Sequence, residues 1–331
     1  MLNKTKILSK LISFTALIAV ALSSAAYATQ YTVMPLGTLG GTSTTVTGIN
    51  STGELVGESL NSAGNDNAFL YSNGVLTNLG TLGGSASQAF GINSSGQVVG
   101  QSTNSAGNWN AFLYSNGAMT NLGTLGGAFS YAVGINSTGQ VVGGSTSSGN
   151  EYAFLYSNGA MTNLGTLGGA FSQANGINSS GQIVGWAANS TGNQNAFLYS
   201  NGAMTNLGTL GGTTSIANGI NSSGQVVGWA DNSAGSQNAF LYSNGVMQNL
   251  NNLLGSASSE YTLTSAVGIN KNGQIAVNGT ITATGQSMGF LLTPVTSASS
   301  AGVPAPATLG LLAAAMAGLL MMRRKRVSAL S

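Results

Sequence analysis

The chain has 331 residues, of which only 4% are charged and 50 are glycine, and it contains neither cysteine nor histidine. This composition excludes disulfides, thiol catalysis, Cys/His zinc sites and an imidazole general base, and no cofactor or metal is predicted. Between the two ends, Lys271 is the single cation against six acidic residues. Such a body has no basic surface for phosphate, which argues against nucleic acid as a partner.

Residues 1–28 have the pattern of a secretory signal peptide. A basic start is followed by an apolar stretch, Leu11–Leu22, and by small residues that end at Ala26 and Ala28. The apolar stretch is shorter than the roughly 20 residues of a membrane-spanning helix. The pattern therefore predicts Sec export and cleavage by signal peptidase after Ala28.

The body of the chain, residues 29–293, is predicted to be a domain of six repeated units of about 43 residues. Three markers give the same number of units: Gly-Ile-Asn, Gly-Thr-Leu-Gly-Gly and Ala-Phe-Leu-Tyr, the last copies of the second and third being altered. The Gly-Ile-Asn triplets begin at Gly48, Gly91, Gly134, Gly176, Gly219 and Gly268.

Each unit reads as four short strands joined by turn residues. Ala-Phe-Leu-Tyr-Ser and the following Ala-Met-Thr-Asn-Leu are joined by Asn-Gly, as at Asn116 and Gly117, which is a strong hairpin signal. A second short turn, residues 137–139, joins the Gly-Ile-Asn strand to the Gln-Val-Val-Gly strand. The Gly-Thr-Leu-Gly-Gly and Asn-Ser-Ala-Gly-Asn segments form the longer connections. Each unit is therefore predicted to be a four-stranded antiparallel sheet.

One such sheet cannot bury both of its faces, so the six units are expected to pack on one another. Four strands in about 43 residues is the size of a propeller blade, and the predicted fold is all-β, a six-bladed β-propeller. The alternative is a β-solenoid. Residues 31–41 resemble the segment that precedes each later unit, and the last strand, residues 289–293, resembles Ala-Phe-Leu-Tyr. The two chain ends could therefore complete one blade, although the sequence leaves the blade boundaries open.

The repeats resemble the extracellular HAF family, whose units contain Gly-Ile-Asn, Gln-Val-Val-Gly, His-Ala-Phe-Leu and Asp-Leu-Gly-Thr-Leu-Gly-Gly. The resemblance covers about residues 31–293 and implies an extracellular repeat protein. Two family positions differ throughout. The histidine is replaced at Asn67, Asn110, Tyr152, Asn195 and Asn238. The aspartate is replaced at Asn78, Asn121, Asn163 and Asn206.

The acidic residues do not form a pattern that is typical of an enzyme. Glycoside hydrolysis needs two carboxylates held a few ångströms apart. Glu54, Glu58 and Asp66 lie in the first unit, and the other acids are spread over later units. The same three could be considered for calcium, but their spacing matches no binding loop. They are expected to be solvated surface residues, no catalytic residue is assigned, and the protein is predicted not to be an enzyme.

One position after the Gln-Val-Val-Gly strand varies between units and holds Trp186 in the fourth unit and Trp229 in the fifth. Aromatic rings at such a position can stack on sugars. Trp109, in a neighbouring connection, is a third candidate. The structural alternative is that the two indoles cover the outer edges of their sheets. Carbohydrate binding by Trp109, Trp186 and Trp229 is the sharpest functional hypothesis.

The linker 294–302 leads to a distinctive tail, residues 303–331. A proline-containing motif is followed by an apolar stretch, residues 307–322, and a basic cluster. This order suits a short membrane segment whose basic end stays in the cytoplasm. The motif residues are Val303, Pro304, Ala305, Pro306, Ala307 and Thr308, and the basic residues are Arg323, Arg324, Lys325 and Arg326.

The tail resembles the PEP-CTERM sorting signal, which exosortase recognises in Gram-negative bacteria that make exopolysaccharide. The family's glutamate is replaced by Ala305. The resemblance implies exosortase as a partner, with membrane anchoring until the tail is processed. Together these features predict a cell-surface or extracellular-matrix protein that binds polysaccharide or envelope proteins and acts as a scaffold. The alternatives are a self-assembling matrix protein and, less favoured, a secreted glycan-active enzyme.

Overall fold

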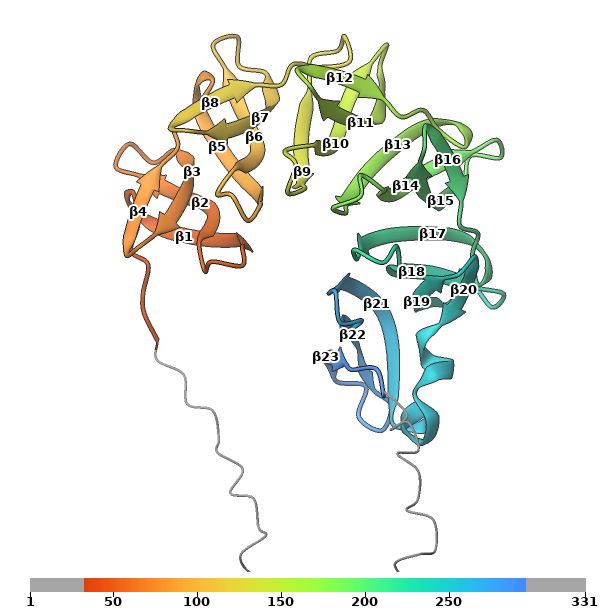
Figure 1. Ribbon diagram of the computed structural model, residues 1–331. Helices are drawn as coiled ribbons and strands as arrows, with labels where there is room; N and C mark the ends of the chain where they lie inside the picture. Colours follow the sequence, from red (N-terminus) through yellow and green to blue (C-terminus); the bar gives the residue numbers. More distant parts are fainter. Residues whose placement is uncertain (1–32, 296–331) are drawn as a thin grey trace, which may run out of the picture. The chain divides into compact units, whose positions relative to one another are not determined.

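The computed structural model describes residues 33–295, which form consecutive antiparallel sheets (Figure 1). A compact unit begins at Thr38, and the described residues before it, 33–37, lie outside strands. The predicted signal peptide, most of the linker and the sorting tail lie outside the described residues.

The strands of each sheet follow one another in chain order, from β1 to β23. The first sheet contains β1 (Gly40–Ile49), β2 (Leu55–Asn61), β3 (Asp66–Ser72) and β4 (Val75–Asn78). The second contains β5 (Gly83–Ile92), β6 (Val98–Asn104), β7 (Trp109–Ser115) and β8 (Ala118–Asn121). The third contains β9 (Ser130–Ile135), β10 (Val141–Ser147), β11 (Asn150–Ser157) and β12 (Ala160–Asn163). The fourth contains β13 (Gly168–Ile177), β14 (Ile183–Asn189), β15 (Gln194–Ser200) and β16 (Ala203–Asn206). The fifth contains β17 (Gly211–Ile220), β18 (Val226–Asn232), β19 (Gln237–Ser243) and β20 (Val246–Asn249). The sixth contains β21 (Tyr261–Ile269), β22 (Ile275–Ile281) and β23 (Ser287–Leu292).

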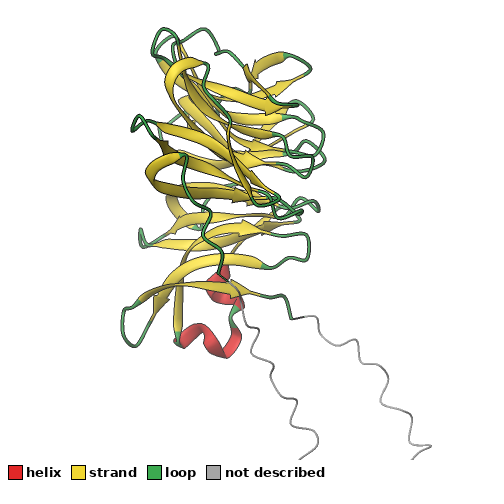
Figure 2. Cartoon of the chain, turned by 90° about the vertical axis from the view of Figure 1, so that its left-hand side faces the viewer, coloured by secondary structure: helices red, strands yellow, loops and turns green. Residues whose placement is uncertain are grey.

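This arrangement confirms the predicted all-β fold of six antiparallel blades. Each unit forms a sheet of its own, and consecutive sheets pack face to face, as the side view in Figure 2 shows. In a β-solenoid, one unit would instead contribute strands to several long sheets. The structure also fixes the blade boundary, because each of the first five sheets begins after Gly-Thr-Leu and β23 pairs with β22 of the sixth sheet.

The predicted hairpins are present and have the backbone that their residues favour. At the β7–β8 turn, Asn116 has a φ of 51° and Gly117 a φ of 81°. Positive φ at both central residues is the two-residue turn that matches the twist of paired strands. The same Asn-Gly turn closes the third and fourth strands of each of the first five sheets.

The core lies between consecutive sheets. At the interface of the third and fourth sheets, Val142 and Ala153 pack against Ile183, Ala187 and Phe197, all buried. Because both faces of an inner sheet are covered, its central strands are apolar runs such as Val-Val and Ala-Phe.

Glycine is required where the first and second strands approach closely. A Cβ on Gly185 of β14 would lie 1.9 Å from the carbonyl oxygen of Gln173 on β13. The corresponding glycines in the other four-stranded sheets meet the same obstacle, at 1.9 to 2.0 Å. The glycine of Gln-Val-Val-Gly is therefore a packing requirement.

The last unit differs because of an insertion before β21. Two 3-10 helices, η1 (Leu250–Leu253) and η2 (Gly255–Ser259), occupy it. Asn249 caps η1 by accepting from the Asn251 N–H at 2.9 Å. Asn251 in turn accepts from the Leu263 N–H at 2.7 Å and donates to the Leu263 carbonyl at 2.9 Å. These contacts attach the inserted segment to the sixth sheet.

Candidate functional site: a variable row on the repeated sheets

The asparagine of each Gly-Ile-Asn triplet is structural. Asn178 is 5% exposed, and its Oδ1 accepts from the N–H groups of Ser180 and Gln182, both at 3.0 Å. Its Nδ2 donates to Gln182 Oε1 at 2.8 Å and to the carbonyl of Asn221, in the next unit, at 3.0 Å. All four hydrogen-bonding positions of this amide are therefore used within the fold.

The donation to the next unit recurs along the domain. The donors are Asn50, Asn93, Asn136, Asn178 and Asn221, and the accepting carbonyls belong to Asn93, Asn136, Asn178, Asn221 and Asn270, at 3.0 to 3.2 Å. We call this series the asparagine chain. The sequence signal was the asparagine in all six triplets, but sequence reasoning did not assign it a role between sheets.

The positions that differ from the HAF pattern also hold turns in place. Asn110 Oδ1, on β7, accepts from Asn104 Nδ2, at the end of β6, at 2.6 Å, so this bond spans the turn between the two strands. Asn121 Oδ1 accepts from the N–H of Gly123 at 2.8 Å, which orders the exit from β8. Asparagine at these places thus serves the scaffold.

The variable position predicted from the sequence forms a row with one member on the second strand of each of the first five sheets. We call it the variable row, and its members are Glu58, Gln101, Gly144, Trp186 and Trp229. Each lies opposite an alanine of the third strand. Trp186 is two residues from Val184, so both side chains are on the face that packs against the fifth sheet. The row therefore lies on the face that each sheet turns to the next.

Cross-strand partners differ along the variable row. Gln101 Nε2 donates to Gln88 Oε1 at 2.7 Å, and Trp186 Nε1 donates to Gln173 Oε1 at 3.2 Å. Trp229 lies opposite Ile216. The partners on the first strands vary together with the row. The variable row and its partners therefore differ chemically from unit to unit, whereas the strands and turns around them are repeated.

In the third unit, glycine at the variable row makes room for a tyrosine. A Cβ on Gly144 would lie 2.7 Å from the hydroxyl of Tyr131. That hydroxyl donates to Glu151 Oε1 at 2.5 Å. Burial raises the pKa of Tyr131 well above its ordinary value, and the hydrogen bond to Glu151 raises it further. Sequence reasoning missed this pair, because the partners are 20 residues apart.

The structure places two of the three candidate tryptophans at equivalent sites. Trp186 and Trp229 are both half-buried and occupy the same register on consecutive sheets. Both are on second strands, between two neighbours, and not at a sheet edge. Trp109 begins β7 of the second sheet, opposite Thr103, at a different register. Trp109 is therefore not part of the variable row.

The first-unit acids are separated. Glu54 directly precedes β2, and Glu58 lies on β2 four residues later. In an extended chain this separation is about 13 Å. Asp66 lies opposite Leu60 on β3. Hydrogen bonds from Asn50 and Ser72 hold the pKa of Glu54 below its usual range. Among residues 33–295, no group of three acidic, histidine or cysteine residues could hold a metal ion.

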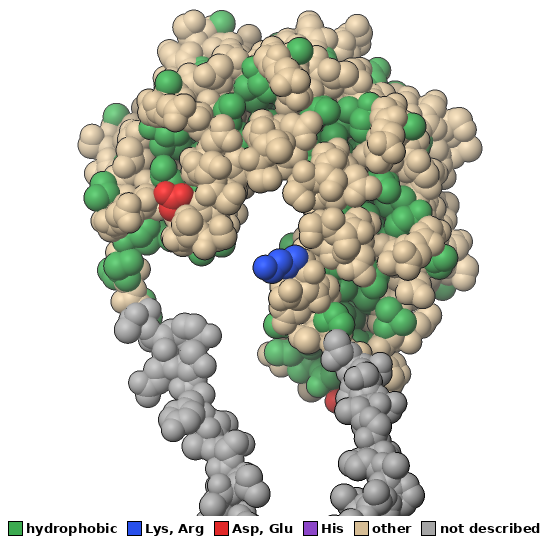
Figure 3. All heavy atoms as spheres, viewed as in Figure 1, with side chains coloured by type: hydrophobic (Ala, Val, Ile, Leu, Met, Phe, Trp, Pro, Cys, Tyr) green, Lys and Arg blue, Asp and Glu red, His purple; other side chains and the backbone are tan. Residues whose placement is uncertain are grey.

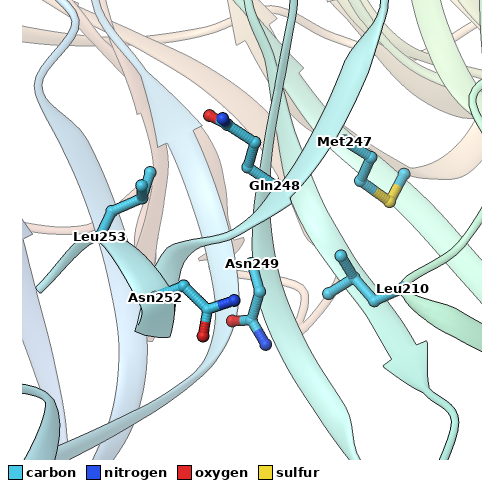
Figure 4. Close-up of a pocket in the computed structure, with 6 residues that line it drawn as sticks. All are labelled: Leu210, Met247, Gln248, Asn249, Asn252 and Leu253. Carbon is cyan, nitrogen blue, oxygen red and sulfur yellow. The ribbon is translucent and has the colours of Figure 1, made fainter.

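A hollow in the fifth unit lies where β20 meets η1 (Figure 4). Its volume is about 370 Å³, and it is lined by Leu210, Met247, Gln248, Asn249, Asn252 and Leu253. Figure 4 shows the Met247 and Leu210 side chains on one side and the Asn249 and Asn252 amides near each other. Amide and apolar groups together suit an uncharged polar ligand. Sequence reasoning missed this hollow because it depends on the inserted helix η1.

The surface around these features is almost uncharged. Figure 3 shows a face covered mostly by polar uncharged side chains and backbone, with apolar side chains scattered over the sheets and very few charges. No helix within residues 33–295 is long and apolar enough to cross a membrane. The predicted membrane segment lies beyond these residues.

No family model matches the chain, and no curated protein matches it. Solved structures do resemble it. TolB from Acinetobacter baumannii is 12% identical, with 73% of this chain and 64% of TolB covered and a TM-score of 0.43. A puromycin hydrolase is 15% identical, with 73% and 44% covered and a TM-score of 0.42. A putative TolB from Agrobacterium tumefaciens is 14% identical, with 69% and 77% covered and a TM-score of 0.34. The chain thus spans less than two thirds of the first two proteins.

Proposed function

We propose that the protein is exported and acts at the cell surface or in the extracellular matrix as a non-catalytic binding and scaffolding module, with polysaccharide as its ligand. The observation that carries the proposal is the placement of Trp186 and Trp229 at one register of two consecutive sheets. The repeated asparagines around them are used by the scaffold, whereas this row changes from unit to unit. An apolar ring beside amide groups is the combination that sugar recognition uses.

The small number of charged residues in the body supports a neutral ligand. The body has six acids and a single cation, and the acids are spread over the sheets. Amides and hydroxyls therefore provide most of the polar groups that a ligand could contact. Exopolysaccharide supplies matching hydroxyl groups without requiring a countercharge.

Binding of the purified protein to an array of bacterial polysaccharides tests the proposal. We expect Trp186→Ala and Trp229→Ala each to weaken binding at least tenfold. Phe171→Ala is the matched control, because Phe171 is an exposed aromatic residue of the same fourth sheet, 46% exposed. Thermal unfolding of all three variants checks that they fold. If binding is absent, or survives both tryptophan changes, the carbohydrate site is not at this row.

The proposed location depends on the two chain ends. We infer that signal peptidase leaves Thr29 as the first residue and that exosortase processes the tail at its Val303–Thr308 motif. Mass spectrometry of the protein from its native host tests both steps. A retained N-terminal segment would contradict export by this route. A retained tail, with the protein in the inner-membrane fraction, would mean that the basic cluster acts as a permanent anchor.

A further inference from the structure

The sixth sheet has three strands in the part of the chain that the structure describes, whereas the other five have four. In each of those five, a short fourth strand follows the Asn-Gly turn and pairs with the third strand. The third strand of the sixth sheet is β23, which pairs with β22 on one side. Exposed strand edges are places where another strand can add.

The neighbouring interface has a cavity at the place of the missing strand. Between the fourth and fifth sheets, Met247 of the fourth strand packs beside Leu198, Ile220 and Tyr242. The counterparts of these last three residues, at the next interface, are Leu241, Ile269 and Leu292. These three line a mostly apolar cavity of about 570 Å³, to which Gln225 and Thr293 contribute the polar side chains.

The sequence before the first sheet contains the counterpart of this strand. Counting back from Gly-Thr-Leu-Gly-Gly, residues 32–36 occupy the place that residues 75–79 occupy before the second sheet. Val33 then corresponds to Met247 and to the equivalent residues Leu76, Met119, Met161 and Met204, all of which are half-buried. Val33 itself is 95% exposed.

The proline of this segment fits the required register. Pro35 corresponds to Asn78, which lies opposite Phe69. Ser72 and Val75 flank the two-residue turn and form a hydrogen-bonded pair, and such pairs alternate along an antiparallel ladder. The N–H of Asn78 therefore points away from β3. A proline at the corresponding position removes no ladder hydrogen bond, and its outer-strand place is one that proline tolerates.

The outer faces of the first and sixth sheets are also complementary. Val46 of β1 is 47% exposed, whereas its counterparts are fully buried: Ala89, Ala132, Ala174, Ala217 and Ala266. Ile49 is 67% exposed and Leu291 of β23 is 66% exposed. At the other interfaces, the counterparts of these two residues are half-buried against the adjoining sheet.

The two ends of the asparagine chain are complementary as well. Asn270 makes the turn bonds of its unit, to the Asn272 and Gln274 N–H groups and to Gln274 Oε1. Within the described residues its Nδ2 donates to no further unit. The carbonyl of Asn50, at the other end, accepts from the Gly53 N–H but from no asparagine of another unit. A donor at one end thus matches an acceptor at the other.

We propose that the domain closes into a ring by docking the chain's own residues 33–36 on the edge of β23, with Val33 filling the cavity and the first sheet covering the sixth. The occupant is this segment because it repeats the residues and register of five existing fourth strands. The closed ring adds a sixth sheet-to-sheet interface of the same kind as the other five. It also buries the two end sheets, which removes the surfaces that head-to-tail self-assembly would use.

Disulfide trapping in the full-length chain tests this proposal, because the protein contains no cysteine of its own. Val33→Cys with Leu292→Cys places two thiols at the expected non-hydrogen-bonded pair, where the Cβ atoms of paired strands are close enough for a disulfide. Tyr71→Cys with Leu76→Cys is the positive control, since these residues are already paired in the first sheet. Val33→Cys with Leu291→Cys is the control for wrong-face contact.

We expect mild oxidation to give an intrachain disulfide in the Val33/Leu292 pair, at a yield similar to the positive control. The monomer should then melt at a higher temperature, and reduction should reverse the increase. Disulfide-linked dimers and longer species would overturn ring closure and favour self-assembly through the same edges. No disulfide, or an equal yield in the Val33/Leu291 pair, would overturn it as well. Circular dichroism of the reduced variants shows that they fold.

Discussion

Removing one amide from the asparagine chain should lower stability by a predictable amount. In Asn178→Ala, the Ser180 and Gln182 N–H groups lose their acceptor, and the Asn221 carbonyl loses its donor. Water can reach the turn, so each N–H should cost about 0.5–1 kcal/mol. The Asn221 carbonyl belongs to a buried residue, and losing its donor should cost about 1–3 kcal/mol. We expect a total loss of about 2–5 kcal/mol in the free energy of unfolding.

Urea unfolding followed by circular dichroism measures this loss. Asn104→Ala is the matched control, because Asn104 also accepts from two turn N–H groups, those of Ala106 and Asn108, but bonds only within its own sheet. It should lose about 1–2 kcal/mol. The difference between the two variants estimates the contribution of the bond between units. If Asn178→Ala costs no more than Asn104→Ala, the asparagine chain does not stabilise the packing of the sheets.

An Asn178→Asp variant separates the donor from the acceptor. The carboxylate keeps both turn bonds but faces Gln182 Oε1 and the Asn221 carbonyl at the place of the amide donor. Burial beside these oxygens should raise the pKa of the introduced carboxyl above its unfolded value. The folded state then favours the protonated form, so the variant should regain stability as the pH falls and lose it as the pH rises through the raised pKa. A pH-independent deficit would refute this reasoning.

Further predictions concern the core, the close approach of two strands and a buried tyrosine. Phe197→Ala should cost about 3–5 kcal/mol in unfolding experiments because Phe197 is fully buried, whereas Phe171→Ala should change stability by only about 0.5 kcal/mol. Gly185→Ala should prevent folding or lower the melting temperature strongly, whereas Gly176→Ala should be tolerated, because its Cβ would meet Val184 at an ordinary 3.5 Å. The raised pKa of Tyr131 means that the folded state keeps its phenol neutral, so stability should fall as the pH rises above the ordinary value of 10.0. Tyr131→Phe should show a smaller fall above that pH, and equal slopes would contradict the prediction.

The repeat pattern made the strands and short turns predictable. Asn-Gly and Asn-Ser-Thr-Gly segments specify turns through local backbone preferences, and the apolar runs between them mark strands that are covered on both faces. These are interactions within a few residues of the chain, so they can be recognised without knowing the fold. The number of units and the all-β class followed from them.

The sequence predicted which position of the repeat varies between units, but not where that position lies in the fold. Its changing residues, including Trp186 and Trp229, stand out against the repeated background. Which face they occupy depends on strand register and on packing against the next sheet. The contact between Tyr131 and Glu151 was hidden for the same reason, because strand pairing brings distant residues together.

The sequence by itself determined six β-rich units, their turns and the absence of cysteine and histidine chemistry. Only the tertiary structure decided where each sheet begins, because the Asn-Gly hairpin and the Gly-Thr-Leu-Gly-Gly connection both look like boundaries along the chain. It also decided that asparagines 42 to 49 residues apart link the units, and that the described part of the sixth sheet has three strands. The physical reason is that hydrogen bonds and packing between units depend on how whole sheets stack, which local residue preferences do not specify.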